Sequence, residues 1–233
     1  MYSRDFCNIY NKYGWDYFSL TMGEAILKYF EFNNKIINSH LDLGCGCGTL
    51  CDYFYHNNIG TKGVDISKYM IEIAKDKNHN IDFEIGDMTN YKSNSTYDLI
   101  TITCDAINHL LNEDSFDYMF KNIYNMLNND GFFIFDILNK DKIEFNKLIV
   151  SNRDNNIKVE YYITEETDLI NTNVKVLKGD KLVFEENEKE KIYSNKFIEK
   201  MLIKNNFNII KISDKILDEE QRFKDKIYFI CKK

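Results

Sequence analysis

A short glycine-rich stretch is the part of this sequence whose residue types and spacing most directly suggest chemistry. Residues 41–50 read LDLGCGCGTL, in which Gly44, Gly46 and Gly48 alternate with other residues. Glycine lets the backbone approach a ligand closely and adopt dihedral angles that other residues avoid. The spacing G-x-G-x-G differs from the G-x-G-x-x-G that sets a helix N-terminus against a pyrophosphate. The stretch therefore indicates a loop that binds a ligand without a pyrophosphate.

Two carboxylates follow this loop, each at the end of a short apolar stretch. Asp65 lies in GVDIS and Asp87 lies in IGDM. A carboxylate at such a strand end can accept hydrogen bonds from both hydroxyls of a ribose, which is the role expected for Asp65. Asp87 can meet an adenine amino group while Met88 packs on the ring, or it can simply cap a turn.

Alternating elements must position these residues. A capping box, Thr21-x-x-Glu24, predicts the start of a helix. Apolar runs then predict five short strands separated by helical patterns, and this alternation indicates a parallel sheet with helices on both faces. The strands are expected at residues 36–43, 63–66, 81–85, 97–104 and 131–138.

The pattern changes in the last hundred residues. Residues 158–193 show strand-like alternation broken by Gly179-Asp180, which is a hairpin signal and predicts an antiparallel insert. A helix is expected over 194–206, followed by strands at 207–212 and 226–230.

Taken in order, LDLGCGCGTL, GVDIS, IGDM and YDLITITCDAINHL resemble the class I S-adenosylmethionine-dependent methyltransferases over residues 36–138. The later region resembles small bacterial members that carry an antiparallel insert. The resemblance implies an α/β, Rossmann-like seven-stranded sheet of order 3-2-1-4-5-7-6, with strand seven antiparallel, helices on both faces and a small antiparallel β insert. It places the cofactor-binding domain at 1–138 and 194–233, and an inserted lid, substrate or dimer subdomain at 139–193.

The same resemblance implies S-adenosylmethionine as the cofactor and S-adenosylhomocysteine as its product. The loop is expected to line the methionine part, Asp65 and Ile66 to hold the ribose, and Asp87 and Met88 to hold adenine. Cys104 and Asp105 follow the fourth strand beneath the cofactor. The expected cofactor-binding residues are Asp42, Gly44, Cys45, Gly46, Asp65, Ile66, Met70, Asp87, Met88, Cys104 and Asp105.

Four further residues are candidates for the acceptor side of the site. His109 can exchange a proton near neutral pH, so it is expected to act as a base or to orient the acceptor, unless it is structural. Tyr10, Tyr13 and Trp15 can close as an aromatic lid over a cationic sulfonium, or can pack on the core.

Composition narrows the acceptor. A formal net charge of −7 disfavours a phosphate backbone as partner. The chain has no proline, so it lacks the Asn/Asp-Pro-Pro-Tyr loop of adenine and glutamine amide methyltransferases and the Pro-Cys of cytosine-5 enzymes. A small-molecule acceptor and no nucleic acid are therefore expected. The acidic run at 185–191 is expected to be a solvated strand face.

The N-terminal residues lack a signal pattern, and no apolar run approaches the roughly 18 residues that span a bilayer. We therefore expect a cytoplasmic protein without a membrane partner, as a monomer or homodimer. Its six cysteines are expected to be free thiols. Cys45, Cys47 and Cys51 form C-x-C-x3-C, which lacks a second ligand pair, so no metal is expected.

The leading hypothesis is an enzyme that moves a methyl group from S-adenosylmethionine to nitrogen or oxygen of a small molecule. Two alternatives stay open on sequence alone. The glycine loop can serve a nicotinamide-dependent oxidoreductase, although its spacing counts against this. The chain can also be a non-catalytic relative that binds S-adenosylmethionine.

Overall fold

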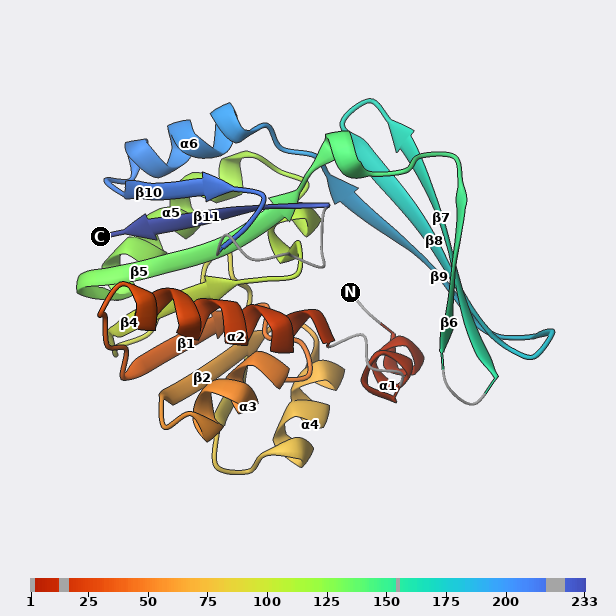
Figure 1. Ribbon diagram of the computed structural model, residues 1–233, viewed down its shortest axis with the longest axis horizontal. Helices are drawn as coiled ribbons and strands as arrows, with labels where there is room; N and C mark the ends of the chain where they lie inside the picture. Colours follow the sequence, from red (N-terminus) through yellow and green to blue (C-terminus); the bar gives the residue numbers. More distant parts are fainter. Residues whose placement is uncertain (1–2, 13–16, 154–155, 217–224) are drawn as a thin grey trace.

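A seven-stranded sheet forms the centre of the molecule, in the order β10-β11-β5-β4-β1-β2-β3 (Figure 1). The computed structural model describes residues 3–12, 17–153, 156–216 and 225–233. The strands of this sheet are β1 (Ser39–Leu43), β2 (Gly60–Asp65), β3 (Asp82–Ile85), β4 (Tyr97–Ile102), β5 (Leu127–Leu138), β10 (Asn208–Ser213) and β11 (Lys226–Lys232).

Strands β1 to β5 pair in parallel, whereas β11 lies antiparallel between β5 and β10. Numbered within this sheet alone, the order is 3-2-1-4-5-7-6 with strand seven antiparallel, so the predicted fold class is confirmed. The parallel strands end at one edge, where their connecting loops meet. In open α/β sheets this edge is where ligands bind.

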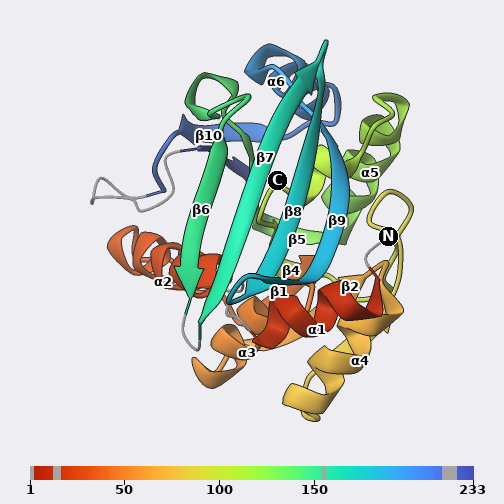
Figure 2. The ribbon, with the colours of Figure 1, turned by 90° about the vertical axis from the view of Figure 1, so that its right-hand side faces the viewer.

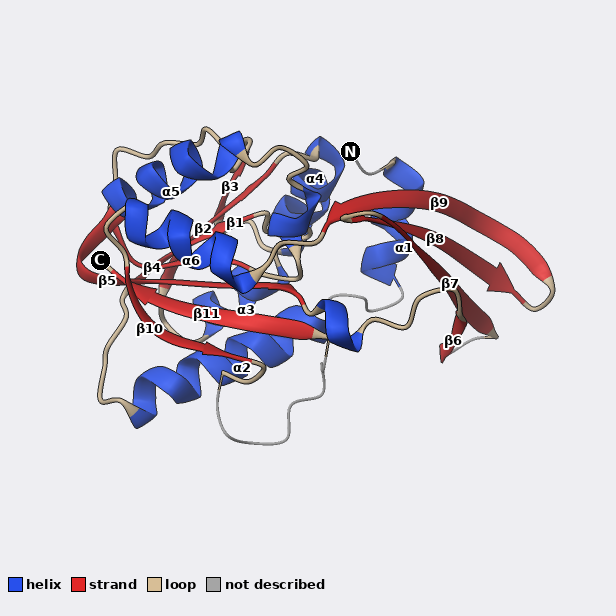
Figure 3. Ribbon diagram, turned by 90° about the horizontal axis from the view of Figure 1, so that it is seen from above, coloured by secondary structure: helices blue, strands red, loops and turns tan. Residues whose placement is uncertain are grey.

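Helices cover both faces of the sheet, with α5 and α6 on one side and α2 on the other (Figure 3). Helix α5 packs on the sheet through one apolar face. The residues of this face recur at helical spacing and are fully buried: Phe116, Met119, Phe120 and Ile123. The helices are α1 (Arg4–Lys12), α2 (Tyr17–Phe32), α3 (Thr49–His56), α4 (Lys68–Lys77), α5 (Asp114–Met126) and α6 (Asn195–Lys204), with short 3₁₀ turns η1 (Ala106–His109) and η2 (Lys140–Lys142).

A second, antiparallel sheet stands beside the carboxyl edge of the first, and its strands run side by side in the order β6-β7-β8-β9 (Figure 2). These strands are β6 (Leu148–Arg153), β7 (Ile157–Glu166), β8 (Leu169–Lys178) and β9 (Lys181–Lys191). The hairpin predicted at Gly179 joins β8 to β9, and Gly179 has a φ of 61°. The insert boundaries at 139–193 stay a prediction, although all four strands fall within them.

Two local expectations are wrong. Helix α2 begins at Tyr17, so Thr21 is inside it and its hydroxyl donates to the Tyr17 carbonyl (3.1 Å) instead of capping the helix. Strand β5 begins at Leu127 rather than 131, because Leu127 already pairs with Tyr97 of β4. Within the described ranges, no helix is both long enough and apolar enough to cross a membrane.

Candidate functional site

A cavity of about 1090 Å³ lies between the carboxyl edge of the parallel strands and the insert sheet. Eleven of the predicted site residues line it: Tyr10, Gly44, Gly46, Asp65, Ile66, Met70, Asp87, Met88, Cys104, Asp105 and His109. Asp42 and Cys45 line a small adjoining pocket of about 30 Å³ that shares Gly44, Gly46 and Cys104 with the cavity. Tyr13 and Trp15 lie outside the described residues.

The glycine loop connects β1 to α3 in a conformation that only glycine adopts readily. Gly44, Gly46 and Gly48 have φ values of 79°, 52° and 77°. The amide nitrogens of Gly44 and Cys45 both donate to the Val64 carbonyl, at 2.7 and 3.0 Å. The loop is therefore fixed against β2 with its backbone facing the cavity.

A side chain at Gly46 and one at Gly48 would meet different surroundings. A Cβ on Gly48 would lie 2.6 Å from the Phe83 ring, so this glycine allows close packing of the loop on the sheet. A Cβ on Gly46 would meet nothing within 4 Å, although Gly46 lines both pockets. The space beside Gly46 is therefore open, and it fits the methionine part of S-adenosylmethionine.

Asp65 links the glycine loop to the start of α4. Its two carboxylate oxygens accept hydrogen bonds from the amides of Gly46 and Ser67, each at 2.8 Å. Burial raises the pKa of Asp65, while these two amide bonds oppose that rise. Each oxygen keeps a further lone pair, and the residue lines the cavity, so the chemistry of the group fits two ribose hydroxyls.

Asp87 follows β3 and caps a turn, which is one of the two roles expected for it from sequence. One of its oxygens accepts from the backbone amide (2.8 Å) and the hydroxyl (2.7 Å) of Thr89, which caps a turn. The residue also lines the cavity next to Met88, whose methyl group would lie 3.9 Å from a Cβ on Gly44. A contact with adenine stays a prediction.

Asp42 is buried beneath the loop rather than in the cavity. It is 2% exposed and accepts a hydrogen bond of 2.6 Å from the Thr101 hydroxyl. Burial raises its pKa to about 7, although the bond from Thr101 acts in the other direction. It can act on a ligand only through the small pocket under Gly44 and Gly46.

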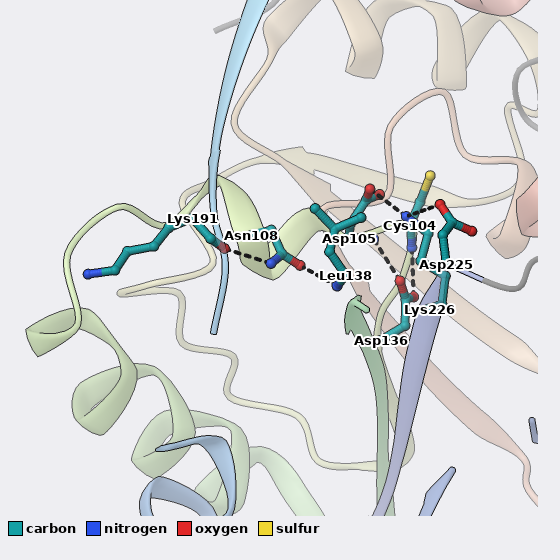
Figure 4. A network of polar contacts seen from close by, with 8 residues as sticks. All are labelled: Cys104, Asp105, Asn108, Asp136, Leu138, Lys191, Asp225 and Lys226. Carbon is teal, nitrogen blue, oxygen red and sulfur yellow. Dashed lines mark hydrogen bonds and ion pairs between the residues drawn. The ribbon is translucent and has the colours of Figure 1, made fainter. Parts of the chain in front are cut away.

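The end of β4 turns sharply at two residues with left-handed backbones, Cys104 (φ 60°) and Asp105 (φ 52°). Both amides donate to the carboxylate of Asp136, each at 2.8 Å, and Asp136 is fully buried on β5 (Figure 4). Such dihedrals cost non-glycine residues about 1–2 kcal/mol each, so Asp136 offsets strain that places this turn under the cavity. Asp136 was not predicted from sequence: a lone carboxylate in GFFIFDIL is conspicuous, but nothing near it in the chain indicates its partners, which lie 31 and 32 residues away.

A buried ion pair adjoins this turn. Lys226, the first residue of β11, places its Nζ 2.5 Å from Asp105 Oδ2 and 3.8 Å from Asp225 (Figure 4). Burial acts to raise the pKa of Asp105, but the Lys226 ammonium outweighs it and holds that pKa below its usual value. Asp105 is therefore ionised and forms a buried ion pair with Lys226.

His109 ends η1 and lines the cavity. Burial lowers its pKa, while the charge of Asp105 and a hydrogen bond with the Lys189 backbone oppose that change. The imidazole is therefore neutral near pH 7 and able to take up a proton.

Asn108, its neighbour in η1, was not singled out from sequence. Its amide donates to the Lys191 carbonyl (2.7 Å) and its carbonyl accepts from Leu138 (3.0 Å), which ties η1 to both sheets (Figure 4).

The comparisons agree with this geometry. Residues 41–131 match the family model described as a methyltransferase domain. A protein from Geobacillus sp. (strain WCH70) that is named as a methyltransferase is 34% identical over 123 residues, covering 50% of this chain and 50% of that protein, so the chain spans about half its length. An S-adenosylmethionine-dependent methyltransferase from Clostridium acetobutylicum ATCC 824 is 26% identical, with a TM-score of 0.81 over 98% of this chain and 97% of that one.

The chain contains a methyltransferase domain over residues 41–131, and its fold is that of S-adenosylmethionine-dependent methyltransferases. CalS10 from Micromonospora echinaspora, an amino pentose methyltransferase with S-adenosylmethionine bound, shares the fold at 13% identity, with a TM-score of 0.79 over 100% of this chain and 98% of that one. These matches support S-adenosylmethionine as the cofactor. The open space beside Gly46 and the remaining lone pairs of Asp65 fit its methionine part and its ribose.

Five of the six cysteines are buried free thiols, and Cys104 is partly buried. Burial raises the pKa of Cys104 well above its usual value, which disfavours a nucleophilic role. Burial does the same to Cys45 and Cys51. No cluster of three metal-binding side chains occurs among the residues that the structure describes.

The acidic run of the insert differs from the expectation. The acidic run at 185–191 is not simply a solvated strand face, because alternate residues of β9 turn toward the cavity. Glu190 is 8% exposed and Glu188 is partly buried, and both line the cavity. Glu185, on the opposite face, is exposed and pairs with Lys175. Alternation along a strand separates the run into an outer and an inner set.

Proposed function

We propose that this protein transfers the methyl group of S-adenosylmethionine to a nitrogen or oxygen atom of a small molecule. The observation that carries the proposal is that a single cavity joins the glycine loop and Asp65 to His109 and the inner face of the insert sheet. Cofactor-binding and acceptor-binding walls therefore face one another across a shared space.

When bound, S-adenosylmethionine supplies an electrophilic methyl carbon, whose bond to sulfur breaks with its electron pair left on sulfur as the acceptor forms the new bond. The residues of this chain are left with binding, alignment and proton removal. Gly46 and Asp65 would hold the cofactor, and the turn at Cys104 and Asp105 would support it from below. His109 would accept a proton from an acceptor that arrives protonated.

Two features support a small acceptor. The insert sheet roofs the cavity, so a long polymer would have to pass beneath β6 to β9. Tyr10 closes another side, where it makes a side-chain hydrogen bond with Cys104. We infer that residues 139–193 serve as the lid over the acceptor. CalS10, which has the same fold, acts on an amino pentose.

The decisive experiment is a methyl-transfer screen over metabolite pools, read by release of S-adenosylhomocysteine, combined with calorimetry of S-adenosylhomocysteine binding. Asp65→Asn should weaken that binding at least tenfold, because it removes a charged acceptor for the ribose. Asp82→Asn, at the exposed start of β3, should leave binding unchanged. No detectable binding to the wild type would overturn the proposed function, and equal affinities for the Asp65 variant and wild type would overturn the ribose assignment.

A further inference from the structure

The inner face of the insert sheet has two chemically different halves. Strands β7 and β8 present apolar side chains to the cavity, including Ile163, Ile170 and Val174, whereas β9 presents glutamates. Across β8 and β9 the register pairs Ile170 with Glu190, Thr172 with Glu188 and Val174 with Glu186. An acidic stripe therefore runs directly beside an apolar stripe.

The two deeper glutamates have no partner within the described part of the chain. Glu190 is 8% exposed, faces the cavity and makes no hydrogen bond or ion pair with a described residue. Glu188 keeps its Oε1 enclosed and without a hydrogen bond. Lys226, the nearby buried cation, is already bound to Asp105 at 2.5 Å.

Buried carboxylates without partners are costly, and proteins normally satisfy them with a cation or a hydrogen-bond donor. Burial first, and then the negative charge of Asp105, raise the pKa of both Glu188 and Glu190, and the charge of Lys226 opposes only part of this rise at Glu190. Among the residues that line the cavity, carboxylates outnumber lysines eight to two. A cationic ligand would complete the site.

We propose that Glu188 and Glu190 bind an ammonium group of the acceptor, whose apolar body lies against β7 and β8. The acceptor is thus an aliphatic amine with a hydrocarbon skeleton rather than a polyhydroxylated one. This inference rests on the proposed function for the meaning of "acceptor", but the binding site itself can be tested without methyl transfer.

The test is calorimetry on the full chain, saturated with S-adenosylhomocysteine, with three probes. Cyclohexylamine carries both features, cyclohexanol lacks the charge, and glucosamine has the charge on a polar body. Cyclohexylamine should bind at least tenfold more tightly than cyclohexanol, and at least fivefold more tightly than glucosamine. Equal binding of the amine and the alcohol would overturn the ammonium site, and tighter binding of glucosamine would overturn the apolar body.

Variants locate the effect. Glu188→Gln/Glu190→Gln should reduce the preference for cyclohexylamine over cyclohexanol to less than threefold. Glu185→Gln, on the outer face of the same strand, should retain the full preference. Binding of S-adenosylhomocysteine, measured in the same instrument, separates the two claims. If the wild type binds S-adenosylhomocysteine but does not bind cyclohexylamine, this inference fails while the proposed function stands.

A second readout needs no ligand. Asp105, Glu186, Asp225 and Lys226 are the charged groups around this pair, and burial raises the pKa of Glu188 from the ordinary 4.5 to about 7. The folded chain therefore keeps protons that the unfolded chain loses, so stability falls as pH rises from about 4.5 to 7. The melting temperature of Glu188→Gln/Glu190→Gln should depend less steeply on pH over this range. An identical slope in wild type and variant would show that the pair is solvated and contradict the inference.

Discussion

The surroundings of His109 determine whether its imidazole is protonated near neutral pH. It is partly buried at the end of η1, and its lowered pKa keeps the ring neutral at physiological pH. A neutral imidazole accepts a proton, whereas a protonated one does not. The ability of His109 to accept a proton is therefore intact at neutral pH, and it is lost as pH falls through the lowered pKa.

We therefore expect His109→Gln to lower the turnover number by about 10²-fold or more, the usual effect of a general base, without changing affinity for S-adenosylhomocysteine. The wild-type pH–rate profile should show an acid limb below the ordinary histidine value of 6.5, and this limb should disappear in the variant. The measurement is steady-state kinetics with an acceptor found by the screen. His56→Gln, on an exposed helix face, is the matched control. Normal turnover in His109→Gln would make the histidine structural.

The site residues divide according to how local their signals are. The glycine loop, Asp65 and Asp87 were predictable, because each lies in a short motif whose neighbours reveal its backbone position. Asp136 and Lys226 were not, because their roles depend on partners far along the chain: Lys226 is 121 residues from Asp105. The role of a buried carboxylate can be assigned only when the neighbouring strand, which supplies its hydrogen-bond donors, is known.

Strands β1, β2 and β4 are joined by a buried polar chain as well as by their backbones. His40 is fully buried between the hydroxyls of Thr61 (2.9 Å) and Thr101 (2.8 Å). Thr101 donates its only hydrogen to Asp42, so it must accept from His40 Nε2. Nδ1 is then the acceptor for Thr61, and the ring is neutral because burial lowers the pKa of His40 to about 3.

This series of buried hydrogen bonds makes the stability of the parallel sheet depend on pH. Below pH 6.5 the unfolded chain protonates His40 but the folded chain does not, so His40 reduces stability as pH falls. His40→Gln should lower the free energy of unfolding by about 1–3 kcal/mol at pH 7. The difference from wild type should then shrink by up to about 1.4 kcal/mol per pH unit between pH 6 and 4.

Urea unfolding at several pH values checks this prediction. The carboxylates outside this hydrogen-bonded chain are common to both proteins, so they cancel in the difference. His79→Gln replaces an exposed histidine and should give a difference near zero at every pH. A constant difference between His40→Gln and wild type would mean that the buried ring is protonated in the folded state.

The elements themselves were largely predictable, and the exceptions have physical causes. The seven strands of the main sheet follow from apolar runs and turn signals, and the hairpin at Gly179 follows from its sequence. The inner set of β9 glutamates was misread because alternation shows that a strand has two faces, but not that a cavity covers one of them. The start of α2 was misplaced because the pattern Thr-x-x-Glu has the same sequence inside a helix as at its N-terminus.

Helix α1 connects the two parts of the molecule. On one side, Cys7 contacts the Ser67 hydroxyl at the start of α4 (3.8 Å). On the other side, the Phe6 ring lies 5.8 Å from the Phe184 ring of β9. Tyr10 of the same helix lines the cavity, and its ring centroid lies 5.9 Å from that of Phe6. The helix thus bridges the cofactor-binding sheet and the insert, and closure of the cavity depends on its remaining in place.

We expect S-adenosylhomocysteine to slow amide hydrogen exchange in residues 4–12, because α1 packs beside the cavity that the ligand would fill. Phe184→Ala should accelerate exchange in this helix about three- to tenfold, since an aromatic pair contributes about 0.5–1.5 kcal/mol beyond its buried area. Val183→Ala, which removes an exposed side chain from the same strand, should have no effect. Mass spectrometry of peptides covering α1 gives the answer. If both variants exchange like the wild type, the helix is held by α4 alone and the insert moves independently of it.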